Sequence, residues 1–379
     1  MKLNLKSLPF LYIFSFFSNL FVGMLGLALP LFALSLGAGN VALGTLGTTS
    51  SFVYIIAVPF SGWLADRVPK NLQAGAGVIL FGATLCLIPF ATKLSWIYPL
   101  VVSYVIGLAL LWPSLESALG RFASGRALAR SSGWYNVSWS SGATIGYLVS
   151  GFIYERSPSL VFWCAGGLAV FFGIMFSLFF RAPDHKEENI DAADSGPVHL
   201  LYISWFLNGT IYFVLNTIRF IFPKLAGDLG MSSADLGWLL LFLSLSQCLL
   251  LLLMNLTAIW HFKFWPMAMA MLVAAAGLAV VALSHRMPGF ALGFFLIGAA
   301  AGVTYSGSLY YAVSLERSIA GSRSGWHEFY VGCGGFSGPL IGGLLAQYLG
   351  PKTPYSVSAI LVLLMLLAMS LYFRAKSRG

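Results

Sequence analysis

Four polar residues recur at helical spacing within the apolar stretch 198–222: Asn208, Tyr212, Asn216 and Arg219. Spacings of four, four and three residues place them on one helix face. Polar groups in an apolar helix are costly, so they face a partner or a cavity, and here they could bind a solute. Arg219 would favour an anionic or zwitterionic one. Two simpler interpretations stay open: interhelical hydrogen bonds for the amides and phenol, and extension of Arg219 to water at the helix end.

A carboxylate suited to proton transfer opens another apolar stretch, 324–349, in the segment Gly325-Trp326-His327-Glu328. We expect Glu328 to be partly withdrawn from water, which suits proton uptake and release. It could instead stabilise the helix N-terminus or pair with a basic residue. The candidate partners are Arg121, Arg126 and Arg317. His327 lies about 100° away around the helix, so we expect no direct pairing with Glu328.

Other chemistry finds no support in the sequence. There is no phosphate-binding glycine loop, zinc-ligand spacing or nucleophile elbow. The four cysteines stand singly in apolar stretches, which predicts neither disulfides nor a metal site. A membrane-embedded enzyme would need His, Asp or Glu converging at one depth, and no such cluster is visible. We therefore predict no catalytic residues, no metal and no cofactor.

The elements that position these residues are membrane-spanning helices. Of 379 residues, 59% are hydrophobic and 9% charged, against about 25% charged in soluble domains. About 20 apolar residues span a bilayer. Twelve such stretches are present: 9–36, 43–65, 72–91, 95–118, 131–154, 159–181, 198–222, 234–259, 264–284, 288–314, 324–349 and 353–374. The sequence predicts an all-α membrane protein of twelve transmembrane helices.

An internal repeat divides these helices into two pseudo-symmetric six-helix halves. The segments Ser132–Gly151 and Ser324–Gly343 share a Ser-Gly-Trp start and three later glycines at an offset of 192 residues. We predict an N-terminal half at 1–181, a cytoplasmic linker at 182–197 and a C-terminal half at 198–379. Small residues on the fifth and eleventh helices predict close packing: Gly142, Gly146, Gly334, Gly338, Pro339, Gly342 and Gly343.

The basic residues predict the orientation. With the N-terminus inside, 15 Lys and Arg fall on the cytoplasmic side and 5 on the outer side, with Arg219 inside a helix. Both termini are then cytoplasmic, in a multi-pass protein of the cytoplasmic (inner) membrane. The net charge of +9 is spread over short loops, which argues against a nucleic-acid partner. The expected partners are the lipid bilayer, a small-molecule substrate and protons.

The segment 62–71, GWLADRVPKN, resembles the signature G-x-x-x-D-R-x-G-R/K-R/K of the major facilitator superfamily. Gly62, Asp66, Arg67 and Lys70 match, whereas Pro69 and Asn71 depart from it. The resemblance implies a cytoplasmic latch, with the aspartate against the start of the eleventh helix. Acidic and basic residues ending the fourth and tenth helices extend the predicted latch: Glu116, Arg121, Glu316 and Arg317. A solvated, positive-inside loop is the alternative.

The same resemblance implies a central cavity lined by the first, fourth, seventh and tenth helices. Besides the face that carries Asn208, it points to Asn19, Tyr104 and Tyr305, with Asn136 on the fifth helix as a further candidate. The eleventh helix carries an antiporter-like pattern, G-x8-G-x3-G-P-x2-G-G, that such antiporters carry on the fifth, so it implies no transport direction here. The first stretch has no acidic residue, which argues against a dedicated cation-drug pump.

The hypothesis is a secondary active transporter that moves a small organic solute across the cytoplasmic membrane by alternating access, with proton coupling. Two alternatives stay open. One is a drug or amphiphile/lipid exporter of the same fold. The other is a transport-dead membrane receptor or scaffold.

Overall fold

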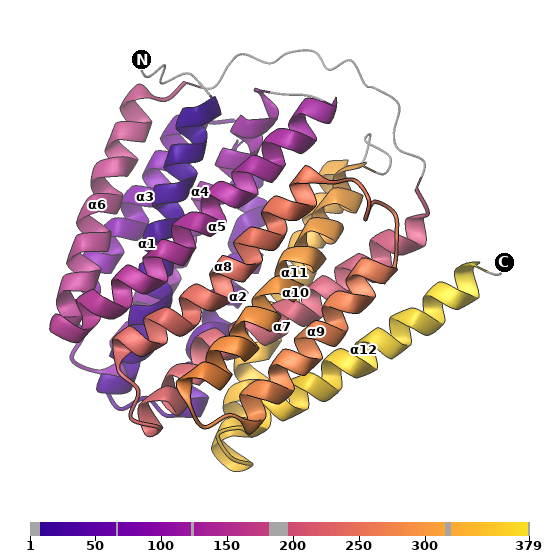
Figure 1. Ribbon diagram of the computed structural model, residues 1–379. Helices are drawn as coiled ribbons and strands as arrows, with labels where there is room; N and C mark the ends of the chain where they lie inside the picture. Colours follow the sequence, from indigo (N-terminus) through magenta and orange to yellow (C-terminus); the bar gives the residue numbers. More distant parts are fainter. Residues whose placement is uncertain (1–7, 66, 123–124, 182–195, 315–319, 378–379) are drawn as a thin grey trace. The chain divides into compact units, whose positions relative to one another are not determined.

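The computed structural model describes residues 8–65, 67–122, 125–181, 196–314 and 320–377 (Figure 1). Within these ranges all the regular structure is helical and no strand occurs. The all-α fold expected from the apolar stretches is therefore confirmed.

In the part of the chain that the structure describes, twelve α-helices follow one another. The first six are α1 Leu8–Ser35, α2 Asn40–Ala65, α3 Lys70–Leu87, α4 Ile97–Gly120, α5 Gly125–Arg156 and α6 Pro158–Phe179. Two 3₁₀ turns, η1 Ile88–Phe90 and η2 Leu94–Trp96, join α3 to α4. The last six are α7 Val198–Asp228, α8 Ser233–Leu256, α9 Trp265–Leu283, α10 Met287–Ser314, α11 Ala320–Tyr348 and α12 Thr353–Ser377.

These helices confirm the twelve predicted ones, and most ends agree within a few residues. The larger differences are that α5 begins at Gly125 rather than 131 and α7 continues past 222 to Asp228. In α7 the extra turns contain Pro223, yet Leu225 and Ala226 beyond it are buried. Tertiary packing keeps this last turn helical, because a helix in membrane proteins tolerates proline where neighbouring groups cover it.

Eleven of the described helices are long and apolar enough to cross a membrane, and α5 is the more polar exception. Its hydroxyl groups find partners on α1. Ser138 Oγ donates to Tyr12 O at 2.5 Å, and Ser150 Oγ donates to Met24 O at 2.8 Å. In the other direction, Tyr12 OH donates to Ser131 O at 3.1 Å. A helix whose polar side chains are paired with a neighbour needs less apolar surface than one that faces lipid.

The chain forms two compact units, and each includes one short segment from the opposite half of the sequence. The first unit holds 1–38, 49–189 and 232–237, and the second holds 39–48, 190–231 and 238–379. Most of the predicted linker, 182–197, lies outside the described residues. The proposed boundaries at 1–181, 182–197 and 198–379 therefore stay a prediction.

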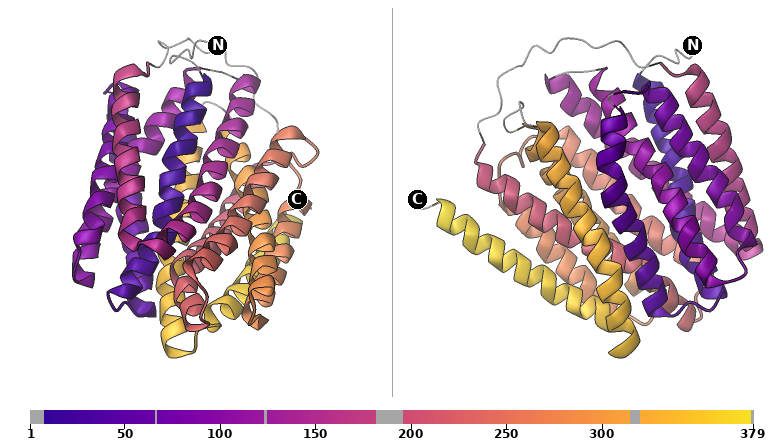
Figure 2. Two further views of the ribbon diagram at one scale, coloured as in Figure 1. Left: turned by 60° about the vertical axis from the view of Figure 1, so that its left-hand side comes forward. Right: turned by 180° about the vertical axis from the view of Figure 1, so that it is seen from behind.

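The same helix pairings recur inside each unit. In the first unit α1 packs on α5, and α3 packs on both α4 and α6. In the second unit α7 packs on α11, and α9 packs on both α10 and α12 (Figures 1 and 2). Helices six places apart in the chain thus have corresponding neighbours, as the sequence repeat leads one to expect.

The repeated glycines lie where α5 packs on α1 and where α11 packs on α7. A Cβ atom at Gly142 or Gly146 of α5 would overlap backbone carbonyls of α1, and one at Gly334 or Gly338 of α11 would overlap those of α7. At Gly342 the same atom would lie 2.7 Å from Thr217 Cγ2. Only a residue without a side chain lets these backbones approach so closely.

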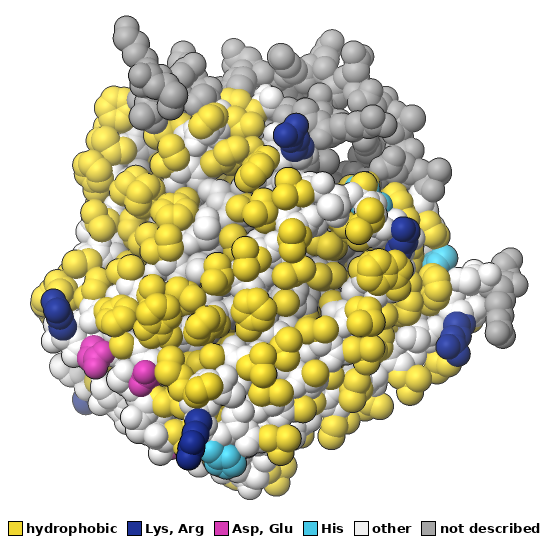
Figure 3. All heavy atoms as spheres, viewed as in Figure 1, with side chains coloured by type: hydrophobic (Ala, Val, Ile, Leu, Met, Phe, Trp, Pro, Cys, Tyr) yellow, Lys and Arg dark blue, Asp and Glu magenta, His cyan; other side chains and the backbone are white. Residues whose placement is uncertain are grey.

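Apolar side chains make up most of the side-chain surface seen in Figure 3, and charged side chains of the described residues are few on that face. In a soluble protein an apolar patch of this extent would promote association. On helices of membrane-spanning length it is the surface that contacts lipid.

Candidate functional site

A cluster of polar and aromatic side chains lies among α7, α10 and α11 of the second unit. α7 packs against both α10 and α11, and the glycines of α11 let it approach α7 closely. We call this group the second-unit cluster: Trp205, Asn208 and Tyr212 of α7, Tyr305 and Ser308 of α10, and His327, Glu328 and Tyr330 of α11.

Asn208 is the most unusual member of the second-unit cluster. Its side chain is 0% exposed, and neither its Oδ1 nor its Nδ2 has a hydrogen-bond partner in the described structure. One turn earlier, Trp205 Nε1 is also buried without a partner, and the Trp205 ring stacks on Tyr330 with centroids 5.8 Å apart. Buried polar groups are nearly always paired, so these two neighbouring groups are candidates for contact with a ligand.

A row of rings leads from α7 to a buried histidine. The Tyr212 and Tyr305 centroids are 6.1 Å apart, and the Tyr305 and His327 centroids are 5.2 Å apart. His327 is 1% exposed on its side chain, and its Nδ1 lies 2.7 Å from Ser308 Oγ in a hydrogen bond. The tyrosines and the imidazole offer π faces and hydrogen-bonding groups to an organic solute.

His327 and Glu328 lie closer together than the sequence suggested. His327 Nε2 is 3.7 Å from Glu328 Oε1, which is too long for a hydrogen bond but within ion-pair distance when the imidazole is protonated. As expected for adjacent residues of α11, no hydrogen bond joins them and His327 Nε2 has no partner among the described residues, but the two side chains lie closer than their directions around the helix suggested. The flexible glutamate side chain reaches back around the helix, so the angle between the Cβ directions does not decide the contact.

The remaining members of the α7 polar face have different surroundings. Asn216 Nδ2 donates to Tyr212 O at 2.9 Å, so this amide is already used within its own helix. Arg219 is half-buried, and its Nε is buried without a hydrogen-bond partner in the described structure. The helix periodicity therefore grouped residues whose hydrogen bonding differs.

The candidates of the first unit lie on three helices, of which α1 packs against both α4 and α5. Asn19 of α1 is buried. Tyr104 of α4 shares a 2.9 Å hydrogen bond with Ser50 of α2. Asn136 of α5 accepts a 3.1 Å hydrogen bond from Trp139 Nε1. Each of these residues stays a predicted substrate ligand.

The predicted latch is described only in part. Asp66, Glu316 and Arg317 lie outside the described residues. Arg67 Nη1 donates to Trp63 O at 3.1 Å, and its guanidinium lies 3.8 Å over the Trp63 ring. Gly62 is half-buried and Lys70 is buried. At the end of α4, Glu116 is exposed and Arg121 half-buried. The latch stays a prediction.

The sequence interpretation missed Ser308, and it missed that His327 is buried in contact with both Ser308 and Glu328. The signal for His327 was its place beside Glu328. The sequence around a single histidine in a helix, however, reveals neither how buried its side chain is nor which residue of a neighbouring helix it contacts. Among the described residues, no group of three or more His, Cys, Asp or Glu could hold a metal ion.

Comparison with known proteins relates the sequence of this chain to one family. The sequence pattern described as Major Facilitator Superfamily matches residues 11–203 and 201–379. Quinolone resistance protein NorA of Staphylococcus aureus is 27% identical over 179 residues, which are 45% of this chain and 45% of that protein. The chain therefore matches about half the length of this curated relative.

Two solved structures share the fold over almost the whole chain. The human organic anion transporter MFSD10 (TETRAN) is 14% identical, with a TM-score of 0.70 over 97% of this chain and 100% of that one. The nucleoside transporter NupG is 13% identical, with a TM-score of 0.73 over 98% of this chain and 99% of that one. At these identities the likeness concerns the fold alone.

Proposed function

This chain belongs to the Major Facilitator Superfamily of transporters, and on that basis we propose that it moves a small organic solute across the membrane by alternating access with proton coupling. The main support for a solute site is the buried, unpartnered amide of Asn208. A fully buried amide with both polar atoms unpartnered costs stability, and a solute that bonds both atoms would recover it. Trp205 and Tyr330 beside it offer stacked aromatic surface.

The chemistry of the second-unit cluster favours a solute with an aromatic or apolar body and a few hydrogen-bonding groups. Rings dominate the cluster, as in most small-molecule sites, and a few polar groups fix the orientation. Arg219, on the same face of α7 as Asn208, would favour an anionic or zwitterionic group on that solute.

The proton site we propose is Glu328, with His327 as its neighbour. The 3.7 Å separation between carboxylate and imidazole lets a proton on either group change the charge seen by the other. Because Tyr305 contacts the imidazole ring and also lies beside Tyr212, a change at this pair reaches the proposed solute site. Gaining or losing the proton would then alter how tightly the solute is held.

Proteoliposomes test the coupling. A thermal-shift screen of metabolites, quinolones and lipids first identifies a ligand, because a ligand at 100 times its Kd stabilises the protein by about 2.7 kcal/mol. With that ligand, Glu328→Gln is expected to keep solute exchange and lose accumulation driven by a pH gradient. Asp228→Asn, at an exposed carboxylate of α7 paired with Lys224, is the matched control and should keep both. Accumulation that survives in Glu328→Gln would place the proton site elsewhere.

A drug exporter of the same fold is the second candidate. The likeness to a quinolone resistance protein favours it, and the match covers 45% of each chain. Stabilisation by quinolones but not by polar metabolites in the same screen would support this alternative. A protein that moves no solute under any imposed gradient would instead be a receptor or scaffold.

We also propose the cytoplasmic membrane as its location, with both termini on the cytoplasmic side. The proposal rests on the 15 Lys and Arg assigned to that side against 5 on the other.

A further inference from the structure

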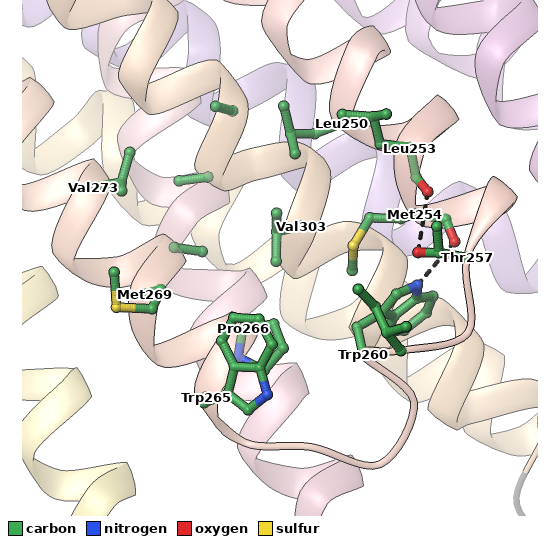
Figure 4. A pocket seen from close by; sticks show the side chains of 14 residues that line it. Leu250, Leu253, Met254, Thr257, Trp260, Trp265, Pro266, Met269, Val273 and Val303 are labelled. Carbon is green, nitrogen blue, oxygen red and sulfur yellow. Dashed lines mark hydrogen bonds between the residues drawn. The ribbon is translucent and has the colours of Figure 1, made fainter.

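An apolar pocket lies in the second unit among α8, α9, α10 and the connection between α8 and α9 (Figure 4). Its volume is about 410 Å³, within the range of about 300–1,000 Å³ that small-molecule sites occupy. Leu253 and Met254 come from α8, Trp265 and Met269 from α9, and Val303 from α10. The second-unit cluster contributes no residue to its lining.

The pocket opens on surface that faces lipid. Three of its lining side chains, Leu253, Trp265 and Met269, are 55%, 56% and 52% exposed. They belong to helices α8 and α9, both long and apolar enough to span a membrane. In a bilayer the molecules against this opening are the acyl chains of lipids, so a chain can enter the pocket without crossing water.

One end of the pocket is closed by the α8–α9 connection, which is firmly held. Trp260 Nε1 donates to Met254 O at 2.8 Å, and Tyr311 OH donates to the Trp260 carbonyl at 3.3 Å. The His261 ring stacks on Tyr310 with centroids 4.0 Å apart. Phe262 has a φ of 52°, a strained value for a residue other than glycine, which these surrounding contacts maintain. Contacts with α10 therefore hold the wall formed by the α8–α9 connection in place, and the pocket is preformed.

The α8–α9 connection also carries a positively charged side chain. Lys263 is exposed, and its ammonium group makes no ion pair with any acidic residue that the structure describes. In the sequence it stands between Trp260 and Trp265, two pocket residues of the type enriched at membrane–water interfaces. A lysine at that level attracts anionic lipid headgroups.

We propose that this pocket holds an acyl chain of an anionic phospholipid whose phosphate lies at Lys263. The apolar walls account for the chain, the lateral opening for its route of entry, and Lys263 for the preference in charge. The site is separate from the solute site proposed above and does not depend on transport. A bound lipid would join α8, α9 and α10 at one end of the second unit.

Native mass spectrometry of the purified chain, titrated with dioleoyl phosphatidylglycerol or dioleoyl phosphatidylcholine, tests the proposal. The wild type should bind one phosphatidylglycerol more tightly than any phosphatidylcholine. Lys263→Gln should lower phosphatidylglycerol affinity about fivefold, since a basic residue near a headgroup contributes about 1 kcal/mol, and leave phosphatidylcholine unchanged. As a substitution at an exposed side chain, it leaves the fold intact.

Ala299→Phe tests the pocket itself. Ala299 lines the pocket from α10, and a phenylalanine ring there would occupy the space of the acyl chain. Binding of both lipids should fall at least tenfold. The matched control is Ala368→Phe on the exposed surface of α12, which should bind as the wild type does.

Three results would overturn the proposal. The first is equal binding of the two lipids by the wild type, and the second is equal binding by Ala299→Phe and Ala368→Phe. The third is a change in the ratio of monomer to dimer in Ala299→Phe with no change in bound lipid, which would make this face an interface between two copies of the chain.

Discussion

Replacing Asn208 by leucine is expected to stabilise the protein while it impairs solute binding. The two side chains are similar in size, so the change fills the same space with apolar atoms. In the present structure the amide is fully buried and neither Oδ1 nor Nδ2 has a partner. The substitution removes two unpaired polar groups from the buried interior and therefore removes their desolvation penalty.

The size of the effect follows from those two groups. A buried donor or acceptor left unpaired costs about 1–3 kcal/mol. Removing both should raise the free energy of unfolding by at least the lower of these values. Each kcal/mol moves Tm by about 2–4 °C in chains of 150–250 residues, and by less in longer chains, so the expected rise is a few degrees. Solute binding should weaken because the amide contacts are lost.

Thermal unfolding of detergent-purified protein, followed by intrinsic tryptophan fluorescence, measures the first effect, and ligand titration measures the second. Asn216→Leu is the matched control on the same helix. Its Nδ2 donates to Tyr212 O, so the change removes a formed hydrogen bond and should leave Tm unchanged or lower. A lower Tm for Asn208→Leu, or a Tm rise with unchanged ligand affinity, would refute the reasoning.

Three further predictions concern packing, charge and orientation. Gly338→Ala should lower the free energy of unfolding by about 1–3 kcal/mol, since the added Cβ would meet the α7 backbone. Gly325→Ala is the control in thermal unfolding, because a Cβ there would have nothing within 4 Å, and equal stabilities of the two variants would contradict the close contact between α7 and α11. Arg219→Gln should reduce the preference for anionic over neutral solutes in uptake assays, and an unchanged preference would mean that its side chain serves only to reach water. A cysteine introduced at Ile190, in a background lacking the four native cysteines, should react with impermeant maleimide only from the cytoplasmic side; reaction from outside would overturn the predicted topology.

The amino-acid sequence by itself determined the number of helices and most of their ends. An apolar stretch of about 20 residues in a bilayer must satisfy its backbone hydrogen bonds internally, so it forms a helix whatever its neighbours are. The start of α5 and the end of α7 were missed because those turns lie outside the apolar stretches, and hydropathy does not report on them.

The sequence also located the close helix contacts. Glycines repeated at 142, 146, 334 and 338 do lie where a Cβ would meet a neighbouring backbone. This was predictable because only glycine permits such an approach, so the residue type itself carries the geometric information.

The hydrogen bonding of the candidate site was decided only by the tertiary structure. Asn208 and Asn216 look alike in sequence and share a helix face, yet one is unpartnered and the other bonds its own helix. His327 meets Ser308 from α10 and lies within ion-pair distance of Glu328 through side-chain torsions that the sequence does not fix. The apolar pocket depends on how α8, α9 and α10 pack together. Helical periodicity fixes which residues share a face, whereas partners on another helix depend on its rotation and depth, which only packing of the whole unit determines.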